Sequence, residues 1–322
     1  MNILSRSVLA LYTYDDNPDD TSLENMMRQS MELVARLPVI AGQAYAVYRN
    51  TFFNKSLNLH NPRDGLSTAE NFLRILRPDS KYTALEARVR PDKSYTPEEA
   101  HLLDLCLIIH AEHGGGNAST FATRVLSSTG TDTYSAIAAG IGALKGPLHG
   151  GANIKVQEMF DCVKANVRDP HNDDELSDFL LRILKGKAND GSGLIYGMGH
   201  AVYTKSDPRA VMLKRYARQL AQDKGYGEDF ELLESIERLT PEVFNTYKGK
   251  HHDICANVDL YSGLVYRMLG IPTEMYTPLF TIARTAGWCA HRMEEILSSG
   301  KIMRPGYKCI ERERPYTELT RR

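Results

Sequence analysis

Helix-start signals followed by apolar residues at helical spacing recur along the chain, and they constrain its fold more than any other feature. Ser67 and Glu70 form one capping-box pair. Thr96 and Glu99 form another, with Pro97 at the first helical position. Apolar residues follow each pair at a spacing of three or four, as on the buried face of a helix. The chain is therefore predicted to be all-α.

The same spacing places the remaining helices. A strongly apolar helix starts at Pro97 and runs toward His110. Strand-like alternation is nearly absent, with residues 301–310 as the one exception. Further helices are predicted over residues 22–36, 38–50, 68–75, 118–128, 132–144, 151–166, 174–184, 208–223, 229–247, 259–269 and 277–298.

Composition narrows the class of protein. The 322 residues, 42% of them hydrophobic, are enough for one large domain or two modest ones. Because 39 Lys and Arg residues balance 40 Asp and Glu residues, the chain lacks the basic excess that nucleic-acid binding needs. No apolar run is long enough to span a membrane, and the N-terminus lacks a signal-peptide pattern. We expect neither a nucleic-acid nor a membrane partner.

The cysteines suggest a reducing compartment. The chain has 5 of them, widely scattered and without a C-x-x-C pair, so neither a disulfide framework nor a zinc ribbon is indicated. A cytoplasmic location fits this pattern best.

Four short clusters carry the residue types that chemistry needs. They are HAEHGGGN (110–117), GPLHGG (146–151), GMGHAV with SDPR (197–209) and NVDLYSG (257–263). A single histidine beside glycine is usually a cap or a partner of a backbone carbonyl. Three such loops together with a carboxylate could supply an acid, a base and hydrogen-bond donors to one site.

Other kinds of site are less well supported. His110 and His113 could share a metal ion on one helix face, but the H-E-x-x-H pattern is absent and no metal is predicted. The G-x-G groups lack a βαβ context, and there is neither a phosphate-binding G-x-x-x-x-G-K-[ST] loop nor a G-x-S-x-G elbow. Acid–base chemistry on a small polar substrate remains.

Asp259 is the candidate base. Asn257 is expected to cap a helix that begins near Leu260, which places the positive end of that helix beside the Asp259 carboxylate. This position is expected to favour the ionised carboxylate.

Arginines are the candidates for carboxylate recognition, because a guanidinium group meets a carboxylate in a bidentate fork. They are Arg209, Arg284 and Arg304. Arg284 lies within the apolar run TPLFTIARTAGWCAH, where a lone charge is costly. It requires an anionic partner or a polar cavity, and a structural salt bridge is the simpler interpretation.

In this order and at these spacings, HAEHGGGN, GPLHGGAN, GMGHAVYTKSDPR, NVDLYSG and RPGYK resemble the citrate synthases, especially the bacterial type that includes 2-methylcitrate synthases. The resemblance runs from about residue 8 to residue 310 and implies that the chain lacks N-terminal elements of the family. It implies an all-α homodimer whose subunits have two domains. Residues 1–152 and 271–322 would form the large domain, N-terminally incomplete, and residues 153–270 the small one.

The resemblance also implies the reaction, in which oxaloacetate and acetyl-CoA condense to citrate and CoA without a metal or other cofactor. By this correspondence His149 would bond the thioester oxygen, Asp259 would remove the methyl proton, and His200 would polarise the ketone. Oxaloacetate would be bound by His113, His200, Arg209, Arg284 and, from the other subunit, Arg304. The coenzyme would contact Leu194, Ile195, Gly197, Gly199 and Lys250.

Two alternatives stay open from the sequence. The acyl donor could be propionyl-CoA, which would make the product 2-methylcitrate. The chain could also be catalytically silent and serve as a dimerising partner.

Overall fold

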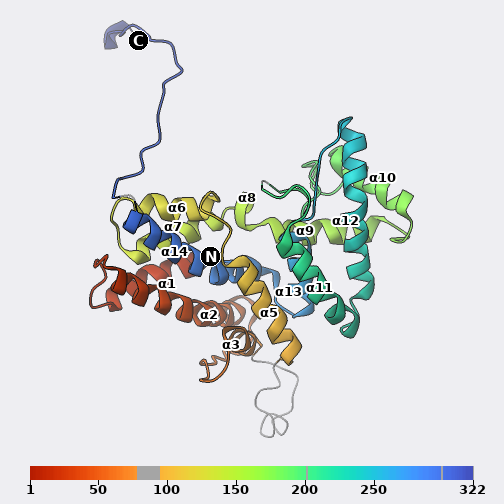
Figure 1. The fold of residues 1–322 in the computed structure, drawn as a ribbon, viewed down its shortest axis with the longest axis horizontal. Helices are drawn as coiled ribbons and strands as arrows, with labels where there is room; N and C mark the ends of the chain where they lie inside the picture. Colours follow the sequence, from red (N-terminus) through yellow and green to blue (C-terminus); the bar gives the residue numbers. More distant parts are fainter. Residues whose placement is uncertain (78–94, 201, 299, 322) are drawn as a thin grey trace.

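The computed structural model describes residues 1–77, 95–200, 202–298 and 300–321, and almost every ordered element in them is a helix. The described residues contain no strand longer than the single antiparallel bridge between Met198 and Ala256. The all-α prediction is confirmed. Figure 1 shows the helices as two neighbouring groups with α8 between them.

The first group packs around the long helix α14, which contacts α2, α5, α6 and α7. In Figure 1 this group lies on the left. Its helices are α1 (Asn2–Leu11), α2 (Leu23–Phe53), α3 (Thr68–Leu76), α5 (Pro97–His110), α6 (Ala118–Ser127), α7 (Thr133–Leu144) and α14 (Tyr276–Ser298).

The second group packs around α13, which contacts α9, α11 and α12. The short helix α8 (Pro147–Gly150) leads into it, and α11 also packs against α5 of the first group. Its helices are α9 (Ala152–Asn166), α10 (Asp173–Leu184), α11 (Pro208–Asp223), α12 (Gly227–Lys248) and α13 (Val258–Met268). The described residues also contain three short 3-10 turns: η1 (Tyr12–Tyr14), η2 (Thr273–Met275) and η3 (Leu319–Arg321).

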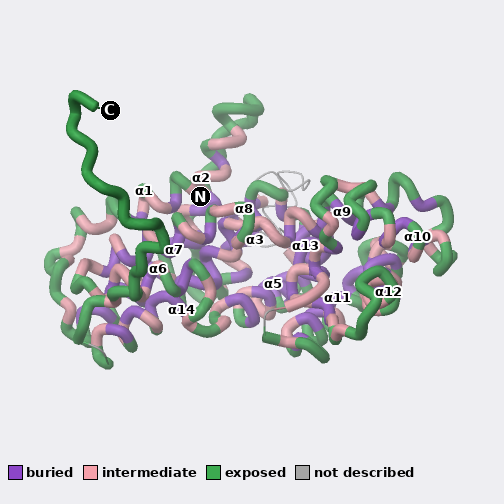
Figure 2. Tube along the Cα trace, turned by 90° about the horizontal axis from the view of Figure 1, so that it is seen from above, coloured by how far each residue is buried: buried purple, intermediate pink, exposed green. Residues whose placement is uncertain are grey.

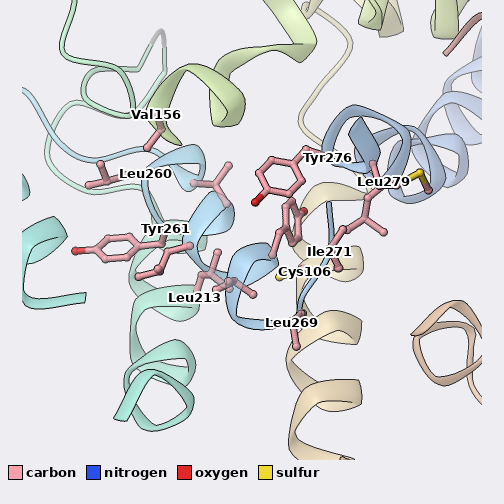
Figure 3. Packing of buried hydrophobic residues seen from close by; sticks show 14 of the residues in the cluster. Cys106, Val156, Leu213, Leu260, Tyr261, Leu269, Ile271, Tyr276 and Leu279 are labelled. Carbon is pink, nitrogen blue, oxygen red and sulfur yellow. The ribbon is translucent and has the colours of Figure 1, made fainter. Parts of the chain in front are cut away.

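One contiguous apolar core joins the two groups. Figure 3 shows Leu260 of α13 beside Val156 of α9 on one side of the cluster. Tyr276 of α14 and Cys106 of α5 lie toward the other side. The side chain of Leu260 is fully buried. Because apolar burial stabilises by roughly 25 cal/mol per Å², this core fixes the start of α13 relative to its neighbours.

The predicted helix starts are confirmed by capping contacts. In α3 the Ser67 hydroxyl accepts the Glu70 amide while the Glu70 carboxylate accepts the Ser67 amide. Thr96 and Glu99 make the same reciprocal pair at α5. Each pair satisfies two amides that a helix start otherwise leaves unpaired.

Three predictions about elements need correction. The helices expected over residues 22–36 and 38–50 are one helix, α2, which continues through Pro38 because buried contacts on either side outweigh the one hydrogen bond that proline removes. Helix α1 was not predicted, although its buried Leu4 and Val8 lie one turn apart. Residues 301–310 form no strand, since no neighbouring chain segment pairs with them.

The C-terminal segment extends away from the helices, as Figures 1 and 2 show. Most of its residues from 300 onward are exposed. Within the described residues, no helix combines the length and the apolar character that crossing a bilayer requires.

Candidate active site

Two imidazoles face each other where the segment after α5 meets the segment before α11. Nε2 of His113 lies 3.0 Å from Nε2 of His200. The backbone amides of Val202 and Tyr203 donate to His200 Nδ1 at 2.8 and 2.9 Å. Because Nδ1 accepts both bonds, the proton of the neutral ring lies on Nε2. His200 therefore presents an N–H donor on the side of His113.

Burial keeps the histidines of this region uncharged at neutral pH. Desolvation, reinforced by the charge of Arg209, lowers the pKa of His113 to about 4. Desolvation and Arg209 also lower the pKa of His200. For His149 desolvation acts together with the charge of Arg284 to lower the pKa. Each neutral ring has one N–H group that donates a hydrogen bond and one nitrogen that accepts one.

Arg209 is held rigidly at the start of α11. Its Nη2 lies 2.8 Å from Oδ2 of Asp207, and its Nε donates to Oδ1 at 3.1 Å. Asp207 is buried and also caps α11 by accepting the Arg209 amide at 2.9 Å. The guanidinium lies over the Tyr203 ring, and Nη2 is 3.4 Å from His200 Nε2. Its charge thus lies beside the two facing histidines.

A short backbone pairing ties residues 194–199 to the start of α13. Met198 and Ala256 form an antiparallel bridge. The Asn257 amide donates to the Gly197 carbonyl at 2.9 Å. The segment that leads into His200 is therefore attached to the segment that leads into Asp259.

The two glycines of GMGH have different structural reasons. Gly197 has a φ of +83°, and a Cβ there would lie 2.9 Å from the Cα of Leu260. Gly199 has a φ of +88°, and a Cβ there would have no other atom within 4 Å. Its carbonyl accepts from Asn257 Nδ2 at 2.9 Å. Gly197 allows α13 to approach closely, whereas the surroundings of Gly199 are open.

Asp259 lies in the first turn of α13, and the predicted cap is confirmed. Asn257 Oδ1 accepts the Asp259 amide at 3.0 Å. The expectation that this position favours the ionised carboxylate is wrong, because desolvation outweighs the helix end and the nearby arginines and raises the pKa of Asp259 to about 6. A carboxyl group with this pKa is a stronger base than an ordinary aspartate and is still ionised at pH 7.

His149 lies in α8 and is oriented by Ser119 at the start of α6. Its Nε2 accepts the Ser119 amide at 3.3 Å and lies 2.8 Å from Ser119 Oγ. Ser119 is fully buried, and its Oγ accepts from Trp288 Nε1 at 3.2 Å and donates to Asn117 Oδ1 at 3.0 Å. With Nε2 an acceptor, the His149 proton lies on Nδ1.

Arg284 is a buried cation in the middle of α14. It is 1% exposed, and its Nε donates to the His110 carbonyl at 2.8 Å. Desolvation lowers the pKa of its guanidinium to about 10. Among the described residues no carboxylate oxygen lies within 4.0 Å of it, so the expected structural salt bridge is not found there. Its charge lowers the pKa values of His113, His149 and Asp259.

The other site residues predicted from sequence differ in their exposure. Arg304 is exposed in the C-terminal segment, and Lys250 is exposed just after α12. Leu194 is 55% exposed, whereas Ile195 is 6% exposed and packs into the core.

Sequence reasoning missed three residues that orient the site. Ser119 fixes His149, Asp207 holds Arg209, and the Tyr203 ring lies 4.7 Å from that of His200. Asp207 precedes Pro208, so its position as a helix cap gave a usable signal. Nothing local in the sequence marks Ser119 or Tyr203.

His110 and His113, which could have shared a metal ion, are placed in different surroundings. Helix α5 ends at His110, so His113 lies beyond it and the two do not share a helix face. The His110 ring is buried, and its Nδ1 bonds the Cys106 carbonyl at 2.7 Å. The described part of the chain contains no group of three or more histidine, cysteine or acidic side chains arranged for a metal ion.

Comparison with known proteins places the chain among relatives. Residues 1–306 match the family model "Citrate synthase, C-terminal domain". A citrate synthase of Synechocystis sp. is 42% identical over 246 residues, 76% of this chain and 53% of the relative. One of Deinococcus radiodurans is 35% identical over 305 residues, 95% of this chain and 71% of the relative. The chain thus spans about half to seven-tenths of the length of these two relatives.

Solved structures agree with the sequence relatives. The citrate synthase of Pyrobaculum aerophilum matches 99% of this chain and 73% of its own, with a TM-score of 0.75 and 30% identity. The Thermoplasma acidophilum enzyme, in a ternary complex with carboxymethyl coenzyme A and oxaloacetate, matches 99% of this chain and 75% of its own, with a TM-score of 0.75 and 28% identity. The fold, the ordered clusters and these matches together show that the chain belongs to the citrate synthase family.

Proposed function

We propose that this chain condenses oxaloacetate with acetyl-CoA and water to form citrate and free CoA. The observation that carries the proposal is the Arg284 guanidinium, buried with no described carboxylate beside it and close enough to lower the pKa values of His149 and Asp259. Glu112 and Asp259 act on this cation from beyond ion-pair distance. A buried cation without a carboxylate in direct contact is costly, and a dianionic substrate would supply that contact. The Thermoplasma relative was solved with oxaloacetate and a coenzyme A derivative.

The first step is enolisation of the thioester. Asp259 removes a proton from the methyl carbon while the His149 Nδ1–H donates to the thioester oxygen. A thioester α-proton is too weakly acidic for a carboxylate acting alone, so base and oxyanion donor must act on the same unit. The Ser119 amide that bonds Nε2 supports this role, because it leaves the donor on Nδ1.

The second step forms the carbon–carbon bond. The enolate carbon attacks the ketone carbon of oxaloacetate, and the ketone oxygen takes the Nε2 proton of His200 as it becomes the hydroxyl of the product. The proton that Asp259 removed from the methyl group returns to His200 through solvent, which resets both residues. The two amides that bond His200 Nδ1 keep the transferable proton on Nε2. Water then cleaves the citryl thioester, releasing CoA as the thiol and citrate as the carboxylate.

Binding roles complete the proposal. Arg284 and Arg209 would bind the oxaloacetate carboxylates, with His113 donating a further hydrogen bond and Arg304 of a second subunit closing the site. The coenzyme would lie along residues 194–199 and near Lys250. We propose that no bound cofactor takes part, since the proton transfers of enolisation and of carbon–carbon bond formation each have a described side chain to perform them.

We further propose a cytoplasmic homodimer whose subunits divide into a large domain, residues 1–152 and 271–322, and a small one, residues 153–270. The grouping of helices around α14 and α13 supports this division. The five cysteines, none of which forms a disulfide, support a reducing compartment.

The test is release of free thiol when oxaloacetate is added with acetyl-CoA or propionyl-CoA. We expect release with both thioesters, because one methylene changes discrimination by only about 1–3 kcal/mol. The proposed function predicts a higher kcat/KM with acetyl-CoA. A higher value with propionyl-CoA would make the chain a 2-methylcitrate synthase. No release from a folded dimer, together with no rise in melting temperature on adding oxaloacetate, would indicate a silent dimerising chain.

A further inference from the structure

The segment of residues 111–117, here named the glycine loop, joins the two halves of the candidate site. His113 lies in the loop and faces His200. Asn117 ends the loop and accepts from the hydroxyl of Ser119, which orients His149. A loop with three consecutive glycines has little stiffness of its own. Whatever fixes this loop therefore fixes both histidine partners.

One face of α14 provides a seat for the glycine loop. Arg284 Nε donates to the His110 carbonyl, just before the loop begins. One turn further along, a Cβ at Gly287 would overlap the Ala111 carbonyl oxygen and the Glu112 carboxylate, so only glycine lets the loop lie there. These positions, at i and i+3, lie on the same face of the helix, and i+7 continues it.

His291 occupies that third position and closes the seat. Its Nε2 lies 3.0 Å from Oε1 of Glu112, and the same carboxylate accepts the Gly114 amide. A Cβ at Gly115 would lie 3.4 Å from the His291 ring, so the loop also packs on the imidazole. The His291 side chain is 14% exposed.

The surroundings of His291 orient it toward the loop. Arg124 of α6 has its Nη1 3.0 Å from His291 Nδ1, and Glu294, on the same helix as His291, lies 3.3 Å from that nitrogen. Arg124 also pairs with Glu294 and with the buried Glu295. Because Arg124 donates to Nδ1, the ring proton that remains on Nε2 faces Glu112.

We propose that His291 and Glu112 are positioning residues: their contact clamps the glycine loop to α14 so that His113 faces His200 and Ser119 faces His149. The inference rests on the proposed function for its kinetic consequence, although the clamp itself is a statement about the loop. A simple surface ion pair would instead add a little stability and leave the reaction unchanged.

The test compares His291→Ala with His291→Gln and with Arg238→Gln. The last variant breaks an ion pair between two helices, Arg238 with Asp173, that lies away from the loop. We expect His291→Ala to lower kcat/KM for oxaloacetate by about 10- to 100-fold, as for a small misplacement of reacting groups. His291→Gln should recover most of the loss, because its amide can still donate to Glu112.

A second readout does not depend on activity. Hydrogen exchange of the peptide that covers residues 111–117 should be faster in His291→Ala than in the unmodified chain, and unchanged in Arg238→Gln. Glu112→Ala should reproduce the kinetic loss, and the double variant with His291→Ala should be no worse than either single one, since both remove the same contact.

Kinetics of His291→Ala equal to those of Arg238→Gln, exchange at residues 111–117 that does not change, or additive losses in the double variant would each overturn the inference. If His291→Ala does not fold, Glu112→Ala carries the same comparison from the loop side. Absence of activity in the unmodified chain would count against the proposed function, while the exchange measurement would still decide whether the clamp exists.

Discussion

Asp259 is a partly buried carboxylate at the point where a helix begins. Its environment works in two directions, since the helix end and the arginines favour the charge while desolvation opposes it more strongly and raises the pKa to about 6. Desolvation makes Asp259 a stronger base, and for the same reason ionisation of Asp259 destabilises the folded state.

Asp259→Asn should therefore separate activity from stability. We expect thiol release to fall by about 100- to 10,000-fold, the usual contribution of a general base, while oxaloacetate still raises the melting temperature. In the unmodified chain kcat/KM should fall as the pH drops below about 6, because the base becomes protonated. Loss of oxaloacetate binding in the variant would assign Asp259 a structural role instead.

The same substitution should stabilise the fold at high pH. The folded-state pKa is raised from 3.8 to about 6, so ionisation of Asp259 destabilises the native state increasingly as the pH rises across that interval. Asparagine removes this penalty, and we expect a gain of about 1–3 kcal/mol at pH 8 that disappears near pH 4. Denaturant unfolding at the two pH values measures it.

Arg284→Gln tests the buried cation directly. We expect KM for oxaloacetate to rise by about 10- to 100-fold, the range for losing one charge-assisted contact. The matched control is Arg292→Gln on the same helix, whose guanidinium is equally buried but donates to Thr133 Oγ1 and the Thr131 carbonyl. That variant should lower the melting temperature without changing KM, and equal effects on KM would remove Arg284 from the substrate site.

The junction between residues 194–199 and α13 depends on one close approach. Gly197→Ala adds a methyl group 2.9 Å from the Leu260 Cα at a φ of +83°. Gly225→Ala imposes a similar φ, +76°, with nothing within 4 Å, and isolates the conformational part, about 1 kcal/mol. We expect Gly197→Ala to cost at least twice as much free energy of unfolding and to reduce activity. Equal losses in the two variants would show that the contact with α13 yields without strain.

Local features of the sequence predicted most of the elements, for a physical reason. The caps at Ser67, Thr96 and Asn257 depend on residues within three positions, so they can be read directly from the chain. Pro38 led to the wrong prediction of two helices, because α2 is held together by packing that the local sequence pattern does not show. Helix α1 was missed because only two of its residues are buried, and two residues make a weak periodic signal.

The contacts that make the site could not be predicted in the same way. His113 and His200 are 87 positions apart, and Arg284 and the His110 carbonyl 174. Arg284 meets the His110 carbonyl where α14 packs against α5, and His113 meets His200 near the packing of α11 against α5; no local pattern contains either contact. The histidines and Asp259 were identified through the ordered clusters, whereas Ser119, whose signal is only its burial against Trp288, was not.

The two helix groups are joined by more than apolar packing. Glu99 at the start of α5 is 4% exposed and pairs with Arg77, which follows α3, and with Lys224, which follows α11. Arg77 also donates to the Leu269 carbonyl at the end of α13. This ionic cluster links one end of the second group to the first.

Glu99→Gln should destabilise the whole molecule. Burial alone would raise the pKa of Glu99, but the bonds from Arg77 and Lys224 outweigh it and lower the pKa below 4.5. The stabilisation is therefore present above pH 4.5 and is lost as the pH falls through the folded-state pKa. We expect a loss of about 3 kcal/mol at pH 7 that shrinks in acid, against less than about 1 kcal/mol for the exposed control Glu158→Gln. A loss independent of pH would contradict the ionic origin.

The pairing of Met198 with Ala256 divides the reacting groups in an unexpected way. Because it fastens the segment before His200 to the segment before Asp259, the proton donor and the base belong to one connected unit carried by the second helix group. Arg284 on α14 belongs to the first group, and the contact with Ser119 of α6 ties His149 to that group. A shift of one group against the other would leave the distance from base to donor unchanged and would alter only the width of the space between them. Such a molecule could admit and release its substrates without realigning the pair that exchanges their protons.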